Sequence, residues 1–164
     1  MSKINAISGS ILATAIAFVS LLSPVSVHAG GAALAQGGFQ VRTGSPALRT
    51  IEFTATRDAQ GNQRGQGQFF NHVSGLTRHL VIDCLHVEDN VAYFSGTLPP
   101  DDPNPYFLMV VKDNGQGAQS DPDEASGLWG DVDPIDCSEI PDYDEMYGWV
   151  IPMFPIEGGN IQVR

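Results

Sequence analysis

Basic residues are scarce in this sequence. Of its 164 residues only 8 are Lys or Arg, against 19 that are Asp or Glu, which gives a formal net charge of −11 at pH 7. A protein that binds nucleic acid needs a basic surface to meet the phosphates. The composition therefore predicts that nucleic acid is not a partner.

Long apolar runs are also missing, apart from one near the start. Residues 11–22 are apolar but too few to span a bilayer, which takes ~20 residues. The run follows Lys3, is broken by Pro24 and is succeeded by the small residue Ala29, a pattern typical of a signal peptide. We expect cleavage after Ala29 and a secreted or periplasmic mature chain, beginning at Gly30, with no transmembrane segment.

Cysteine is rare, since only Cys84 and Cys137 occur. Two cysteines in an exported chain are expected to form one disulfide, and a single pair leaves no choice of partner. The two cysteines are 53 positions apart. A disulfide that closes a loop of this length should stabilise the fold by roughly 4 kcal/mol, because it lowers the entropy of the unfolded chain. The alternative is two separate thiols, one of them buried.

Sustained helical periodicity is absent, and turn residues are frequent, with 18 Gly and 11 Pro. In Arg49–Arg57 apolar and polar side chains alternate, as in a strand with one wet face, whereas Tyr106–Lys112 is apolar enough for a fully buried strand. Leu80–Val87 and Val91–Leu98 predict a central hairpin that turns through a left-handed Asn90. About seven short strands indicate an all-β fold, a single antiparallel β-sandwich or barrel-like domain with a long acidic loop.

The domain boundaries follow from these segments. We expect a signal peptide over residues 1–29, a flexible Gly-rich leader over 30–46 and a β-rich domain over 47–164. Within the leader, Phe39–Thr43 predicts a short edge strand. Gly65 and Gly67, at the start of a later strand, predict a bulge or a closely approaching backbone.

A series of short motifs resembles a family of small exported bacterial β-rich domains, which occur alone or appended to surface-anchored proteins. The motifs are I-E-F-T-A at 51–55, G-Q-G at 65–67, C-L-H-V at 84–87, N-V-A at 90–92, F-L-M-V-V at 107–111, D-N-G at 113–115 and G-N-I at 159–161. The resemblance covers roughly Gly37 to Val163. It implies a β-sandwich-like fold and export, and it brings no catalytic residues with it, because the family has no established activity.

The acidic residues are concentrated in one stretch, because Asp101–Glu145 holds 13 of them against a single base, Lys112. Calcium takes six to eight oxygen ligands, and pairs of carboxylates two positions apart on an irregular loop suit it. The candidate calcium ligands are Asp121, Asp123, Asp131, Asp133 and Asp136. The spacing does not follow the EF-hand, and the alternative is a solvated surface loop.

Aromatic side chains lie in or beside the same stretch. Trp129, Tyr147 and Trp149 are candidates for a carbohydrate-binding surface, because aromatic faces flanked by carboxylates hold sugars by stacking and hydrogen bonding. Alternatively, they anchor the loop to the domain.

Catalytic patterns are missing, including the nucleophile elbow, the H-E-x-x-H zinc motif and the phosphate loop. His72, His79 and His86 fall seven positions apart, so neighbours within a strand face opposite sides and predict no metal site. The sequence predicts an exported non-enzymatic module with a structural or binding role, at the cell surface or outside the cell, whose partner is an extracellular ligand or surface component. The alternatives are a calcium- or carbohydrate-binding module and a secreted hydrolase that uses loop carboxylates.

Overall fold

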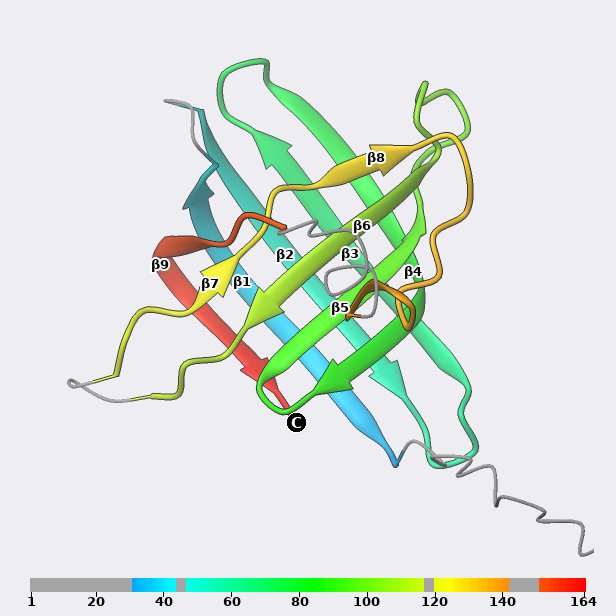
Figure 1. Cartoon of the computed structure of the whole chain (residues 1–164). Coiled ribbons are helices and arrows are strands. Elements are labelled where there is room, and N and C mark those ends of the chain that lie inside the picture. The colour runs from blue at the N-terminus through cyan, green and yellow to red at the C-terminus, as the bar shows by residue number, and fades with distance from the viewer. Residues whose placement is uncertain (1–30, 44–46, 117–119, 142–150) are drawn as a thin grey trace, which may run out of the picture.

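The computed structural model of the chain describes residues 31–43, 47–116, 120–141 and 151–164 (Figure 1). The predicted signal peptide and its cleavage site lie outside these residues. The strands are β1 (Ala33–Arg42), β2 (Leu48–Arg57), β3 (Gln63–Asn71), β4 (Leu76–Glu88), β5 (Val91–Thr97), β6 (Tyr106–Lys112), β7 (Glu124–Ala125), β8 (Trp129–Asp131) and β9 (Phe154–Val163).

The strands close into an antiparallel barrel. Strands β1 to β6 pair in chain order, β9 pairs with β1, and the short β7 bridges β9 and β6 to complete a ring of eight. Strand β8 is a ninth strand, paired with the beginning of β6. In Figure 1, β6 and β8 run across β2 and β3, so two sides of the barrel face each other. The all-β antiparallel prediction is confirmed. Of the two architectures left open, the structure has a closed barrel and not a sandwich, and it has more strands than the seven expected.

Aromatic side chains fill the interior of the barrel. Phe53 on β2 stacks on Phe94 on β5 with ring centroids 4.7 Å apart, and both contact a further ring edge-on, Phe39 for the first and Phe107 for the second. All four are at most 4% exposed. An eight-stranded barrel is just wide enough to be filled by side chains or to hold one small ligand, and this barrel is filled.

The structure corrects the prediction of a flexible leader over residues 30–46. Ala33, Ala35, Phe39 and Val41 are buried and alternate with exposed or half-buried residues, so this stretch is β1, paired on both sides, and not a short edge strand. Glycine and alanine are depleted in strands, which hid the alternation behind a composition typical of linkers.

The predicted central hairpin is present as β4 and β5, with a tighter turn than expected. Glu88 pairs with Val91, which leaves two residues in the turn. The residue with positive φ is Asp89, at 53°, and not Asn90. Strand β6 is buried throughout its middle, which confirms that prediction.

The later glycine and strand predictions also have clear outcomes. A Cβ on Gly67 would lie 2.7 Å from the carbonyl oxygen of Glu52, so the close backbone approach predicted there is confirmed. The last strand, β9, runs without a break from Phe154 to Val163. Among the described residues, no helix is long and apolar enough to cross a membrane.

Candidate functional site

The outer surface of the barrel is covered on one side. Cys84 on β4 forms a disulfide with Cys137, with Cα atoms 5.9 Å apart, which confirms the predicted crosslink. Beside it, the buried Ser95 hydroxyl donates a 2.5 Å hydrogen bond to the carbonyl oxygen of Ile135. The segment around Cys137 therefore lies against the outer face of β4 and β5, because outward-facing side chains of both strands hold it there.

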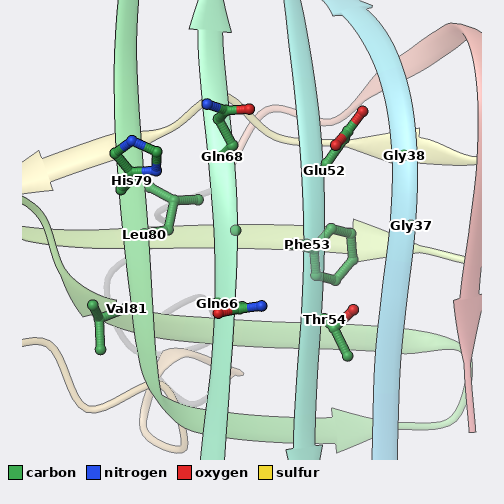
Figure 2. Close-up of a pocket in the computed structure, with 11 residues that line it drawn as sticks. Gly37, Gly38, Glu52, Phe53, Thr54, Gln66, Gln68, His79, Leu80 and Val81 are labelled. Carbon is green, nitrogen blue, oxygen red and sulfur yellow. The ribbon is translucent and has the colours of Figure 1, made fainter.

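The outer face of β1 to β4 carries a hollow of about 670 Å³ (Figure 2). Its lining residues come from four neighbouring strands: Gly37, Gly38, Glu52, Phe53, Thr54, Gln66, Gly67, Gln68, His79, Leu80 and Val81. Leu80 and Phe53 are core residues whose strands form the floor, whereas the polar side chains point outward.

The register of the sheet arranges the polar side chains in two rows that cross the strands. Gln68 is paired with Glu52 on one side and with His79 on the other, which makes the first row. Gln66 is paired in the same way with Thr54 and Val81, which makes the second row. Figure 2 shows both rows across the strands, with the core side chains between them. Val81 is an exposed apolar side chain, and we call the other five residues, Glu52, Thr54, Gln66, Gln68 and His79, the polar rows.

The hydrogen-bonding groups of the polar rows are free within the described part of the chain. Glu52, Thr54, Gln66, Gln68 and His79 make no side-chain hydrogen bond to any residue that the structure describes. Neighbouring polar side chains on the same face are paired instead. They include Gln36 with Gln162 at 2.9 Å, Thr50 with His72 at 2.8 Å and Gln116 with Asn160 at 3.2 Å. Donors and acceptors within the hollow are therefore open to an external partner.

Two glycines of β1 have different roles at the edge of the hollow. A Cβ on Gly37 would lie 2.7 Å from the carbonyl oxygen of Asn160, so a side chain there would displace backbone. A Cβ on Gly38 would meet only the Cγ of Glu52, at the ordinary contact distance of 3.7 Å. Gly38 therefore leaves space that a larger residue would fill without disturbing the barrel.

The lining of the hollow carries little charge. Glu52 is its only carboxylate, and it contains neither Lys nor Arg. The nearest polar neighbours in the rows are the neutral amides of Gln66 and Gln68. A single carboxylate among amides and a hydroxyl can bind a ligand by hydrogen bonds, but it lacks the second carboxylate that glycoside hydrolysis normally requires.

The candidate calcium ligands do not converge in the described part of the chain, where no group of three or more His, Cys, Asp or Glu could hold a metal ion. Asp123 is 6% exposed, and its two carboxylate oxygens accept backbone N–H bonds from Asn114 at 2.9 Å and Ile161 at 2.8 Å. Asp131 accepts from the N–H of Val132 at 2.6 Å. Asp123 and Asp131 therefore already serve as backbone acceptors.

The remaining candidates differ in their contacts and exposure. Asp136 accepts hydrogen bonds from the hydroxyl and N–H of Ser138, and these bonds lower the pKa of its carboxyl. Asp121 and Asp133 are exposed. All five candidate ligands lie in the described chain without forming a cluster, so calcium binding by the acidic loop stays a prediction for solution measurements.

Of the candidate aromatic residues, Trp129 lies on β8, is 41% exposed and pairs with Leu108. Tyr147 and Trp149 lie outside the described residues. Two of the three histidines have ordinary protein contacts, since His72 pairs with Thr50 and the His86 ring lies 6.0 Å from that of Tyr93. The third, His79, belongs to the polar rows, which sequence reasoning did not find.

A signal for the hollow was present in the sequence. The polar positions of the alternating strand Arg49–Arg57 include Glu52 and Thr54, and the G-Q-G-Q stretch of β3 supplies Gln66 and Gln68. Only the register between strands reveals that these residues are neighbours. Comparison of the chain with known protein families, curated proteins and solved structures gives no match.

Proposed function

We propose that this protein is an exported, non-enzymatic binding module that holds a ligand or surface component against the outer face of β1 to β4. The single observation that carries the proposal is the hollow lined by the polar rows, whose hydrogen-bonding groups have no partner in the described chain. The resemblance to small exported β-rich domains is part of the same proposal.

Two further features support a surface site. The interior is filled by the phenylalanine cluster, so ligand carriage inside the barrel is disfavoured. The disulfide between Cys84 and Cys137 is compatible with an oxidising compartment such as the periplasm or the extracellular space. Export therefore remains part of the proposal, supported by the crosslink and by the signal-like start of the sequence.

A hydrolase is the weaker candidate. The hollow has one carboxylate, Glu52, and no nucleophile with an adjacent base. In the acidic loop, Asp123 and Asp131 are engaged by backbone N–H groups, which suits a role in holding the loop. The hollow therefore lacks a second carboxylate.

The proposal is tested by co-sedimentation of the purified, oxidised protein with cell-envelope material from cells that naturally make it. Gly38→Leu fills the hollow with a side chain that the backbone accommodates. Gln40→Leu is the matched control, because Gln40 is an exposed residue of the same strand and the same outer face but does not line the hollow.

We expect the wild type and Gln40→Leu to sediment with the envelope and Gly38→Leu to remain in solution. Circular dichroism and thermal melts check that all three proteins are folded. If all three proteins sediment equally with the envelope, the hollow is not the binding site. Failure of all three to sediment would favour a structural role over a binding role at this surface.

A further inference from the structure

We infer that the ligand of the hollow is a neutral oligosaccharide, which lies across β1 to β4 and is held by the polar rows. This inference rests on the proposed function and names the chemical class of the ligand. It is carried by three properties of the hollow: the kind of hydrogen-bonding groups, the absence of Lys and Arg, and an open shape that extends across four neighbouring strands.

The hydrogen-bonding groups suit hydroxyls. Each glutamine amide of the polar rows offers donors and acceptors side by side, Thr54 adds a hydroxyl that does both, and Glu52 adds an acceptor. A sugar hydroxyl also donates and accepts, so two neighbouring groups of the polar rows can make both hydrogen bonds of one hydroxyl. Because these side chains are not paired with one another, binding does not require breaking internal hydrogen bonds.

The charge favours a neutral ligand. Phosphate, sulfate and uronate groups are normally held by Arg or Lys, and the lining has neither. Glu52 would repel such groups, and the protein as a whole carries a net charge of −11. A sugar without charged substituents meets no such penalty.

The sheet geometry disfavours a peptide. Each of β1, β2, β3 and β4 is hydrogen-bonded to a strand on both sides, so no free edge is available for an added strand. The hollow also lacks a deep apolar pocket for a side chain, because Phe53 and Leu80 face the core. Gly38, in contrast, leaves an open place where the flat C–H face of a sugar ring can approach the backbone.

The extent of the hollow indicates an oligomer rather than a single sugar. Neighbouring strands lie ~4.8 Å apart, so the distance from β1 to β4 is about 14 Å. A chain of sugars along the first row would pass from Gly38 over Glu52 and Gln68 to His79. Since the hollow presents no outward-facing Trp, Tyr or Phe ring to stack on a sugar, we expect weak affinity, with Kd on the order of 0.1–1 mM.

The test is an NMR titration of the full, oxidised, ¹⁵N-labelled protein with short cello-, malto- and chitooligosaccharides. We expect at least one of these to shift the amide signals of residues 36–38, 52–54, 66–68 and 79–81. Heparin and polygalacturonate fragments are anionic, and they test whether the hollow prefers charged sugars to neutral ones.

Variants give the inference its specificity. Gln66→Leu and Gln68→Leu should each weaken binding about 3- to 10-fold, because each removes hydrogen bonds to neutral groups. Gly38→Leu should abolish binding, and Gln40→Leu should leave it unchanged. Glu52→Gln should change affinity for the neutral ligand less than the leucine substitutions do, since the amide keeps an acceptor.

Three results would overturn the inference. They are the absence of shifts with every neutral oligosaccharide, shifts that persist in Gly38→Leu, and stronger binding of the anionic fragments. The envelope experiment separates these failures from that of the proposed function. If Gly38→Leu still abolishes sedimentation while neutral oligosaccharides do not bind, the hollow is a binding site for another ligand class.

Discussion

Asp123 shows how one carboxylate organises the acidic part of the chain. It is 6% exposed, and its two oxygens accept N–H bonds from Asn114, at the start of the loop, and from Ile161 in β9. Its own carbonyl oxygen accepts from the N–H of Ile156, also in β9. A carboxylate that bridges two segments in this way fixes the loop to the barrel wall.

We therefore expect Asp123→Asn to lower the free energy of unfolding by about 1–3 kcal/mol, because the amide NH₂ replaces one buried acceptor and faces a backbone donor. Urea denaturation of both proteins measures the difference. Asp121→Asn is the matched control, because Asp121 is exposed and should change stability by less than about 0.5 kcal/mol. Equal effects of the two substitutions would show that loop charge, and not the N–H bonds of Asp123, determines the result.

The carboxylate of Asp102 predicts how the stability of the protein falls at acidic pH. Asp102 accepts a hydrogen bond from Arg78, and its side chain is 8% exposed. This bond, with a further one from the N–H of Asn104, lowers the pKa of Asp102 in the folded protein. The unfolded carboxyl titrates at about 3.9. The contribution to stability is therefore complete above about pH 4 and is lost as the pH falls through the lowered pKa of the folded state.

We expect the melting temperature of the wild type to fall steeply below about pH 4, and that of Asp102→Asn to be lower at neutral pH with a shallower acid limb. Differential scanning calorimetry from pH 2 to 7 measures both curves. Asp101→Asn removes the same charge at an exposed neighbouring position. If its curve coincides with that of Asp102→Asn, the ion pair with Arg78 is not the cause.

At the scale of the element, strands with a clear hydrophobic pattern could be predicted and others could not. The alternating side chains of β2 and the buried run of β6 determine their own conformation, and both strands lie where the sequence places them. Strand β1 was predicted only in its second half, as an edge strand at Phe39–Thr43, because the small residues before it resemble a linker. Strand β7 has only two residues, and it forms because β6 and β9 supply partners on both sides.

The hollow, like β7, depends on how the strands pair and could not be predicted from any one strand. Its residues are unremarkable within each strand, and their meaning arises when the register brings β2, β3 and β4 side by side. Sequence reasoning instead selected the acidic stretch, because charge is visible without knowledge of the register. The crosslink was predictable, since a sequence with two cysteines leaves a single pairing.

The segment that covers β4 and β5 is held by the crosslink as well as by hydrogen bonds. We expect Cys137→Ser, or reduction of the wild type, to lower the free energy of unfolding by about 2–5 kcal/mol, because the unfolded chain regains the freedom of a 53-residue loop. Urea titrations with and without reductant measure this loss. The native protein should contain no thiol that reacts with an alkylating agent.

The double variant Cys84→Ser/Cys137→Ser is the control for this measurement. Reductant should not change its stability, because it has no disulfide to lose. If reductant leaves the wild type as stable as before, the hydrogen bond between Ser95 and Ile135 and its neighbours would hold the segment without covalent help.

At the scale of the whole molecule, the charge is unevenly distributed. Of the 19 acidic residues, 13 lie between Asp101 and Glu145, with Lys112 as the only base. Lys112 forms a half-buried ion pair with Glu124 at 3.3 Å, and Arg78 pairs with Asp102. Most of the carboxylates that the structure describes in this stretch have no Lys or Arg beside them. These carboxylates repel one another, and any dissolved salt should weaken the repulsion by screening the charges.

The calcium hypothesis adds a specific expectation to this general one. If the acidic loop binds calcium, millimolar calcium should raise the melting temperature beyond the rise given by magnesium or sodium at the same ionic strength. Thermal melts in the three salts measure the difference. The same rise in all three would contradict a calcium site and leave screening as the explanation.

The closure of the barrel through β1 and β9 has a mechanical consequence. Leu34 and Arg164 exchange backbone hydrogen bonds of 3.0 and 2.9 Å, so the chain enters the barrel beside the point where it leaves. Tension applied at these two points would load the bonds between β1 and β9 one at a time, from one end, and the wall would open at low force. The unravelling would stop at the crosslink, because the 53-residue interval it encloses, about 180 Å of extended chain, cannot lengthen. Such a domain would unfold at low force, and the disulfide would limit how far it can extend.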